Sequence, residues 1–199
     1  MLKTKIKPTK SHQWPKQGYW TYQDYLMLPD DGKRYEIIKG VLYMVNAPSF
    51  QHQFITSTLT RLLGNFVTEN ELGLVLTAPF EVHLTEDTRP VQPDVLFIRS
   101  ENWPDTESSF FEGVPDLIVE VLSPSSTRTD RIAKFTIYEQ AKVSEYWIVN
   151  PKTCAIEIYT LIDEQYELKG EFTNEETIES VILVGLKLTT NHLFPKPKT

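Results

Sequence analysis

Val91-Gln92-Pro93-Asp94-Val95-Leu96-Phe97-Ile98 and Asp116-Leu117-Ile118-Val119-Glu120-Val121-Leu122 are the two stretches that decide the expected fold. Both are rich in β-branched and large apolar residues, which predicts strands. A strand that is apolar on both faces belongs to a sheet that is covered on both sides. Each stretch also carries one carboxylate, Asp94 or Glu120. Burying a carboxylate costs on the order of several kcal/mol unless it is paired, hydrogen-bonded or bound to a metal.

A helix is predicted after the second strand, capped by Thr129 and running to about Gln140. In it Lys134 follows Asp130 and precedes Tyr138 by four residues, so the three share one helix face. Two strand carboxylates followed by a helical lysine predict a divalent-metal site. Mg²⁺ suits such a site because it binds one or two carboxylates together with waters and substrate phosphate. It can activate water for phosphodiester hydrolysis, while the lysine orients that water or stabilises charge on the phosphate.

Each of these residues also has a simpler interpretation. Asp94 could belong to an ordinary X-Pro-Asp turn, and Glu120 could form a buried salt bridge with Lys134 or Arg131. Lys134 on its own is typical of a solvated helix face. Two further candidates are less clear: Glu36 is either a third metal ligand or an outward-facing strand residue. His52 is either a site residue or a capping or surface histidine.

The remaining pattern predicts a mixed sheet with two substantial helices. A strand, a helix and a strand follow one another around Glu120, which implies a parallel crossover. The fold class is therefore α/β or α+β. The expected helices and strands are Thr21–Leu28, Arg34–Ile38, Val41–Val45, Phe50 to about Val67 with Ser49 as N-cap, Leu74–Leu76, Phe80–Leu84, Glu145–Val149, Ala155–Leu161, Gln165–Leu168 and Val181–Val184, with a polar loop over 100–114.

Composition limits the class of protein. The 199 residues are 40% hydrophobic and 24% charged, which fits one globular domain over residues 20–199. Cys154 is the single cysteine, so no intramolecular disulfide can form, which is compatible with a cytoplasmic location. No apolar run approaches about 18 residues, so we expect no membrane span. The histidines lack zinc-ligand spacing, and no nucleotide-binding loop or serine-hydrolase motif is present.

Charge is unevenly distributed along the chain. The formal net charge is −7, but residues 1–20 contain five lysines and no acid, so the remainder carries −12. We expect residues 1–19 to form a basic N-terminal arm, either a solvated terminus or a segment that contacts phosphates. The acidic remainder argues against strong nonspecific binding to DNA.

Several short motifs occur together in a fixed order. They are Tyr35-Glu36-Ile37-Ile38-Lys39-Gly40, His52-Gln53, Gln92-Pro93-Asp94-Val95-Leu96-Phe97, Pro115-Asp116-Leu117-Ile118-Val119-Glu120-Val121-Leu122-Ser123-Pro124-Ser125, Lys134-Phe135-Thr136-Ile137-Tyr138 and Glu145-Tyr146-Trp147-Ile148-Val149. Over about residues 20–165 this set resembles the Uma-type family of restriction endonuclease-like proteins, formerly a domain of unknown function and abundant in cyanobacteria.

The resemblance implies the PD-(D/E)XK nuclease fold, a mixed sheet flanked by helices, with Mg²⁺-dependent cleavage of phosphodiester bonds. Pro93-Asp94 would supply the PD element and Glu120 the (D/E) element. The third element departs from the pattern, because Leu122 stands where a lysine is expected. Lys134 would replace that lysine, and Glu36 would complete the acidic cluster. Asp94, Glu120 and Glu36 are then the expected metal ligands, with Lys134 and His52 as further catalytic candidates.

Three functions remain open from the sequence. The first is a Mg²⁺- or Mn²⁺-dependent endonuclease that cuts DNA, as a homodimer because two sites are the simplest way to cut both strands. The second is a nucleic-acid-binding or interaction module that keeps the nuclease scaffold with little catalysis. The third is a hydrolase of small phosphoesters.

Overall fold

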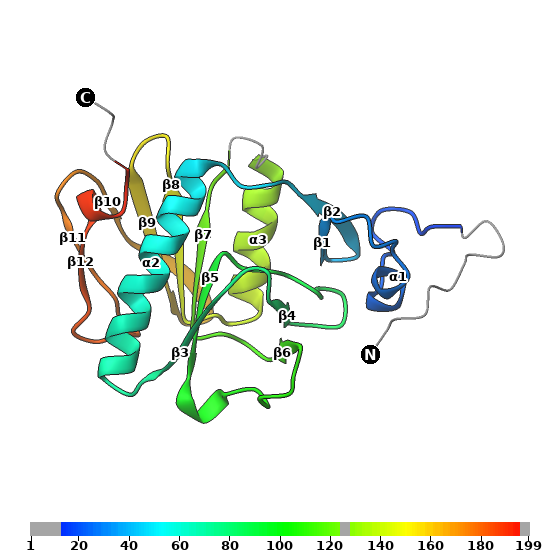
Figure 1. The fold of residues 1–199 in the computed structure, drawn as a ribbon, viewed down its shortest axis with the longest axis horizontal. Helices are drawn as coiled ribbons and strands as arrows, with labels where there is room; N and C mark the ends of the chain where they lie inside the picture. Colours follow the sequence, from blue (N-terminus) through cyan, green and yellow to red (C-terminus); the bar gives the residue numbers. More distant parts are fainter. Residues whose placement is uncertain (1–12, 124–127, 196–199) are drawn as a thin grey trace.

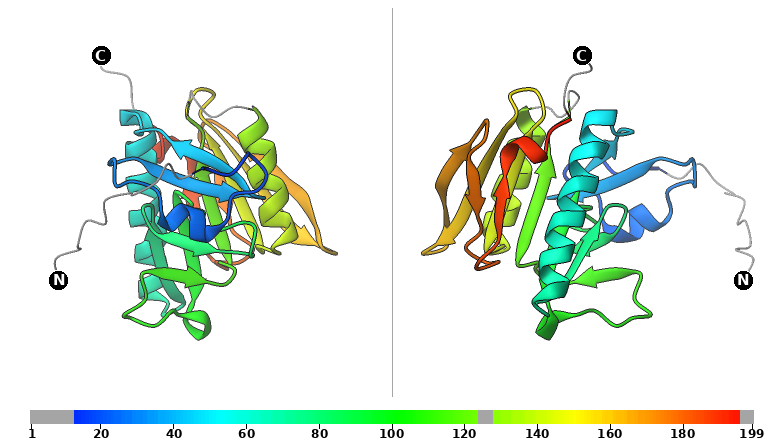
Figure 2. Two further views of the ribbon diagram at one scale, coloured as in Figure 1. Left: turned by 90° about the vertical axis from the view of Figure 1, so that its right-hand side faces the viewer. Right: turned by 60° about the vertical axis from the view of Figure 1, so that its left-hand side comes forward.

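A computed structural model describes residues 13–123 and 128–195, and it shows a six-stranded mixed sheet between two helices. Helices α2 (Phe50–Glu69) and α3 (Arg128–Gln140) lie on opposite faces of this sheet (Figures 1 and 2). In spatial order the strands are β10 (Gln165–Phe172), β9 (Ala155–Ile162), β8 (Glu145–Asn150), β7 (Leu117–Val121), β5 (Val95–Arg99) and β3 (Gly73–Thr77). The predicted α+β class with a mixed sheet and flanking helices is confirmed.

The predicted parallel crossover is also present. β7 and β8 pair in parallel, with Leu117 opposite Glu145, and α3 connects them. The other neighbours in the sheet pair antiparallel. β7 therefore lies inside the sheet with a strand on each side, which accounts for its apolar sequence.

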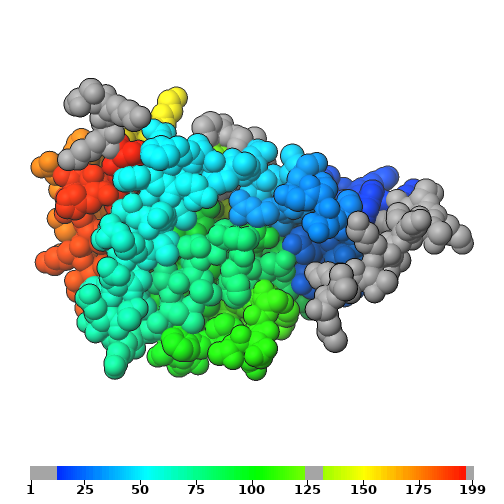
Figure 3. Space-filling model, viewed as in Figure 1, coloured from blue at the N-terminus to red at the C-terminus, as the bar shows by residue number. Residues whose placement is uncertain are grey.

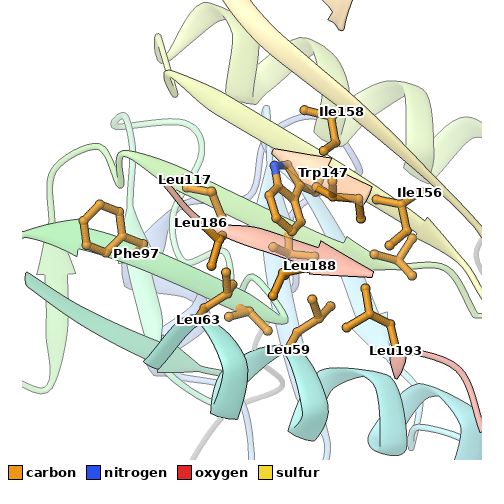
Figure 4. Close-up of a cluster of buried hydrophobic side chains, with 14 of the residues drawn as sticks. Leu59, Leu63, Phe97, Leu117, Trp147, Ile156, Ile158, Leu186, Leu188 and Leu193 are labelled. Carbon is orange, nitrogen blue, oxygen red and sulfur yellow. The ribbon is translucent and has the colours of Figure 1, made fainter. Parts of the chain in front are cut away.

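Alternation along the strands divides the core into two layers. Val95, Phe97, Leu117 and Val119 pack with the α2 side chains, in a cluster that includes Leu59 (Figure 4). The intervening residues face α3 instead, in a second buried cluster. That cluster includes Leu96, Ile98, Ile118, Tyr146 and Ile148 from the strands, with Ile137 and Tyr138 from α3. Because side chains alternate with a period of two, Glu120 belongs to the α3 side of β7.

A two-stranded hairpin lies apart from the main sheet and contributes one wall of the later site. β1 (Arg34–Ile38) and β2 (Val41–Val45) pair antiparallel around Lys39 and Gly40, which both have positive φ, at 48° and 69°. A side chain at Gly40 would meet a backbone oxygen at 2.5 Å, so glycine is required there. The hairpin attaches to the rest of the protein through hydrogen bonds such as the one from the Ile37 N–H to the Pro90 carbonyl.

The predicted caps of the first two helices are confirmed. Thr21 and Asp24 form a capping box at α1 (Tyr22–Leu26), and the Ser49 side chain caps α2 by accepting from the His52 N–H. α2 is the main core helix that the periodicity predicts. In the space-filling view it crosses one face of the molecule between the C-terminal segment and the β1–β2 hairpin (Figure 3).

A small parallel pair, β4 (Glu81–His83) with β6 (Phe110–Glu112), holds α1 in place. Tyr25 donates to Glu81 at 2.7 Å, Tyr22 does so at 3.4 Å, and His83 Nε2 lies 3.4 Å from the same carboxylate. The His83 ring stacks on Phe110 with centroids 4.2 Å apart. The half-buried Glu81 carboxylate thus connects α1 to β4, and the stacked His83 ring connects β4 to β6.

A fully buried glutamate fixes the C-terminal segment. The Glu145 carboxylate accepts from Trp147 Nε1 at 2.6 Å and from the N–H groups of Val181 and Ile182 at 2.6 and 3.1 Å. These three donors replace water around the buried charge.

Several local predictions are wrong. The loop predicted over 100–114 contains a 3₁₀ turn, Ser100–Asn102, and β6. Residues 181–184 form bends rather than a strand, whereas β11 (Thr177–Glu179) and β12 (Lys187–Thr189) form a hairpin that the sequence did not indicate. These strands are three residues long and depend on tertiary pairing, so they carry no periodicity of their own.

Two predictions fall next to, or within, segments outside the described residues. α3 begins at Arg128, so the predicted cap Thr129 lies in its first turn, and the residue before the helix lies outside the described residues. Most of the predicted basic arm, residues 1–12, also lies outside them. Within the described part of the chain, no helix is long and apolar enough to cross a membrane.

Candidate active site

A pocket with a volume of about 160 Å³ lies between the β1–β2 hairpin, the start of α2, the ends of the β5 and β7 strands, and α3. All five candidates from the sequence line it: Glu36, His52, Asp94, Glu120 and Lys134. They come from five separate segments of the chain, so only the tertiary fold brings them together. Leu122, which stands where the nuclease pattern has lysine, also lines the pocket.

Glu120 forms the buried floor of this arrangement. Its Oε1 accepts from Lys134 Nζ at 2.9 Å and from the Tyr138 hydroxyl at 2.7 Å. Lys134 and Tyr138 are one helical turn apart on α3, and α3 covers the face of β7 to which Glu120 belongs. The strand period and the helix period therefore explain together why these three groups meet.

Lys134 connects two carboxylates that are far apart in the sequence. Its Nζ lies 3.2 Å from both oxygens of Glu36 and 2.9 Å from Glu120. Burial alone would lower the pKa of Lys134, but the carboxylates of Glu120, Glu36 and Asp94 raise the pKa above its ordinary value. The side chain is therefore a fixed ammonium group.

Glu36 is itself held in place. Its Oε1 accepts from the backbone N–H of Gln92 at 2.7 Å, and its side chain is 5% exposed. In this structure Glu36 thus holds Lys134 and joins the hairpin to the segment before β5. The predicted role of Glu36 as a metal ligand stays a prediction.

Asp94 is the residue immediately before β5. Its Oδ2 accepts from the Val121 N–H at 2.8 Å and lies 3.1 Å from His52 Nε2. Burial lowers the pKa of His52, but the hydrogen bond and charge of Asp94 more than offset this, so the pKa of the imidazole is raised. His52 therefore has its backbone N–H in the cap of α2 and its ring against a pocket carboxylate.

The pocket contains more carboxylate groups than cationic groups that contact them. Burial raises the pKa of Glu120 to about 7, with contributions from Asp94 and Glu36, although Lys134 acts in the opposite direction. A carboxylate with a raised pKa in a cleft is a common feature of functional sites. A cation bound beside Glu120 would favour its ionised form.

Tyr138, which bonds to Glu120 beneath the pocket lining, and Gln92 were not proposed as site residues from the sequence. Tyr138 was noted only as sharing a helix face with Lys134, and its hydrogen bond to Glu120 could have been inferred from that spacing. Gln92 stands two residues before Asp94 and also lines the pocket. In a strand that began at or before Gln92, that spacing would place both side chains on one face, so the sequence does contain a signal for Gln92.

The donor groups fit a cation held by few protein ligands. Across residues 13–123 and 128–195, no group of three acidic, histidine or cysteine side chains forms a ready metal-binding cluster. Mg²⁺ commonly uses one or two carboxylates and completes its shell with waters and substrate phosphate. The contacts described above engage only one oxygen of Asp94 and one of Glu120, so these two carboxylates fit the requirement.

The fold of this protein, a mixed sheet flanked by helices, is shared with a solved structure. A solved structure from Anabaena variabilis, titled "putative nuclease belonging to DUF820", superposes with a TM-score of 0.76 at 19% sequence identity. The match covers 87% of this chain and 97% of that one. The shared architecture is a mixed sheet flanked by helices.

The Uma2 family model, described as "Putative restriction endonuclease", matches residues 22–191, and the chain belongs to this family. Two uncharacterized proteins of Synechocystis sp. are also similar. One, sll1609, is 26% identical over 157 residues, covering 78% of this chain and 88% of its own length. The other, slr1290, is 27% identical over 135 residues, covering 66% and 68%.

Proposed function

We propose that this protein is a metal-dependent endonuclease that hydrolyses phosphodiester bonds in DNA. The observation that supports this most is the ammonium group of Lys134 between Glu36 and Glu120, in the same pocket as Asp94. Membership of a family described as restriction endonucleases points to the same class of reaction. In this proposal Lys134 takes the part of the lysine that the nuclease pattern places two residues after Glu120, where this chain has Leu122.

Each residue has a distinct part in the proposed reaction. Asp94 and Glu120 would hold Mg²⁺ or Mn²⁺, which when bound supplies an activated water and neutralises phosphate charge. Lys134 offers a preorganised positive charge to the phosphate. Glu36 and Tyr138 hold Lys134 and Glu120 in position, and His52 orients Asp94.

A nicking assay on supercoiled plasmid tests the proposal. Purified protein should nick DNA with Mg²⁺ or Mn²⁺ and not with excess chelator. Asp94→Asn and Glu120→Gln should abolish nicking, and Lys134→Met should reduce it by at least about a hundredfold, since oxyanion-stabilising groups are typically worth that much. Lys142→Met is the matched control, because Lys142 is an exposed lysine that follows the same helix and pairs with exposed Glu164.

Parallel reactions on single-stranded DNA and RNA test the substrate. Preferential cleavage of RNA would replace DNA in the proposal, and failure to cut any substrate across metals and ionic strengths would contradict endonuclease activity. Size-exclusion chromatography with light scattering tests the homodimer that is part of the proposal for cutting both strands.

A second candidate is a module on the same scaffold that binds nucleic acid without cutting it. Leu122 at the position of the usual lysine favours this reading. It predicts that DNA shifts in a gel with the wild-type protein and stays intact in every metal. Nicking that requires Asp94 would exclude it.

A further inference from the structure

Gln92 is a buried polar side chain in the wall of the pocket. It is 8% exposed, and it lines the same pocket as Asp94 and Glu120. Its backbone N–H donates to Glu36, which fixes the residue against the β1–β2 hairpin. The side-chain oxygen Oε1, in contrast, is shielded from solvent, and no donor within the described residues forms a hydrogen bond with it.

An unpartnered buried acceptor needs a physical reason. Most buried polar atoms in folded proteins are hydrogen-bonded, and the exceptions commonly mark a place for a water or an ion. Leaving such a group without a partner is unfavourable to the folded protein. Among the described residues, the side-chain oxygen of Gln92 has no partner, and a group that enters the pocket can supply one.

The position of Gln92 points to the cation rather than to solvent. Gln92 and Asp94 are separated by one residue, and both line the pocket, whereas the intervening Pro93 does not. The last torsion of a glutamine side chain is broad, so its oxygen can turn into the pocket without a shift of the backbone. Amide carbonyl oxygens are established ligands of hard divalent cations.

We propose that the side-chain oxygen of Gln92 is an additional ligand of the divalent cation bound by Asp94 and Glu120. This inference rests on the proposed function, because it assumes that the pocket binds a cation. It assigns to Gln92 an oxygen donor beside those of Asp94 and Glu120, while the Glu36 carboxylate contacts Lys134 and the Gln92 backbone N–H.

Two variants separate a ligand from a structural residue. Gln92→Leu keeps the size of the side chain and removes the oxygen, and Gln92→Glu keeps an oxygen in place and adds a charge. Thr160→Val is the matched control, because Thr160 Oγ1 is another unpartnered buried oxygen, on β9 and outside the pocket. Asp94→Asn serves as the variant that removes a principal ligand.

The experiment is Mn²⁺ titration by calorimetry, combined with thermal unfolding with and without Mn²⁺. Without metal, both Gln92→Leu and Thr160→Val should raise Tm by about 2–4 °C, since each removes an unpaired buried oxygen. With metal, Gln92→Leu should weaken Mn²⁺ binding about tenfold and lose part of the Mn²⁺-induced rise in Tm. Gln92→Glu should bind at least as tightly as wild type, and Thr160→Val should bind equally.

The outcomes distinguish a wrong role for Gln92 from the absence of a cation site. If wild type and Gln92→Leu bind Mn²⁺ with equal affinity while Asp94→Asn does not bind, the role of Gln92 is wrong and the cation site stands. If wild type itself binds no Mn²⁺, the metal-dependent function is contradicted and the inference fails with it. A Gln92→Glu variant as weak as Gln92→Leu would also overturn the proposal, because the donor oxygen would not matter.

Discussion

Lys134 Nζ lies 2.9 Å from Glu120 Oε1, so a helix supplies the ammonium group that faces a carboxylate on the preceding strand. The two residues are 14 positions apart, and α3 covers the face of β7 that carries Glu120. Leu122 meanwhile continues the apolar wall of the pocket, and its N–H donates to the Val149 carbonyl. The charge at the site therefore does not depend on a lysine in the strand.

Removal of the ammonium group should destabilise the fold as well as the chemistry. Lys134→Met leaves Glu36 and Glu120 buried without their cation, and breaking a buried ion pair in this way costs about 3 kcal/mol or more. Glu120→Gln should recover part of that loss when combined with Lys134→Met. Urea unfolding of the four proteins in a double-mutant cycle, in chelator, measures this coupling. Additive losses would contradict the pairing, and Lys142→Met should stay within about 0.5 kcal/mol of wild type.

His52 should affect nicking activity by orienting Asp94, with little effect on the stability of the fold. The imidazole lies 3.1 Å from Asp94 Oδ2, and loss of a group that orients a metal ligand typically lowers metal affinity or activity by about 10- to 100-fold. His52→Ala should therefore reduce nicking by about that factor while its Tm stays near that of wild type. Thr56→Val removes only the more distant contact to His52 Nδ1, at 3.4 Å, and should have a smaller effect. An unchanged rate for His52→Ala would assign the ring to packing alone.

Glu145 should contribute strongly to stability and not to the site. Glu145→Ala would leave the Trp147 indole and the N–H groups of Val181 and Ile182 without their acceptor. We expect a loss of at least about 2 kcal/mol, or about 4–8 °C in Tm for a domain of this size. Hydrogen exchange at Val181 and Ile182 should accelerate well before global unfolding. Glu171→Ala on the exposed edge strand is the control, and equal effects of the two changes would refute the role of Glu145.

Acid should release α1 from the fold. Burial alone would raise the pKa of Glu81, but hydrogen bonds from His83 and the Tyr25 hydroxyl lower it below its ordinary value of 4.5. A lowered carboxyl pKa adds stability that is complete above the unfolded value and is lost as pH falls below it. Amide exchange in Tyr22–Leu26 should therefore accelerate below about pH 4. In Glu81→Gln the segment should exchange faster at pH 7 and show no further step in acid; a wild-type-like step would point to another group.

The sequence predicts the main sheet and the two large helices because their periodicity is strong. Glu120 is a carboxylate within an apolar strand, and Lys134 and Tyr138 share a helix face. Each side of the contact between Glu120 and these two residues can therefore be inferred from the local sequence. The parallel crossover that brings them together follows from chain handedness and connection length. The convergence of Glu36, His52, Asp94, Glu120 and Lys134 in one pocket is observed, while their roles in metal binding and catalysis stay predictions.

Other features depend on contacts that no local pattern encodes. β6 and the β11–β12 hairpin are too short to show a period, and each exists because a distant segment pairs with it. Glu145 at the start of β8 looks like an ordinary polar strand end until the backbone near Val181 is placed against it. Gln92 is adjacent to the Pro-Asp motif, but the lack of a partner for its side-chain oxygen is a three-dimensional fact.

The proposed replacement of the strand lysine by Lys134 on α3 changes how related proteins can be found. A text search that expects a lysine two residues after the strand carboxylate Glu120 misses this site, since Leu122 stands there. A search template built from atom positions, with an ammonium nitrogen near a strand carboxylate and a second acid beyond it, retrieves it. Chains set aside as inactive because one letter is missing warrant inspection of the helix that follows.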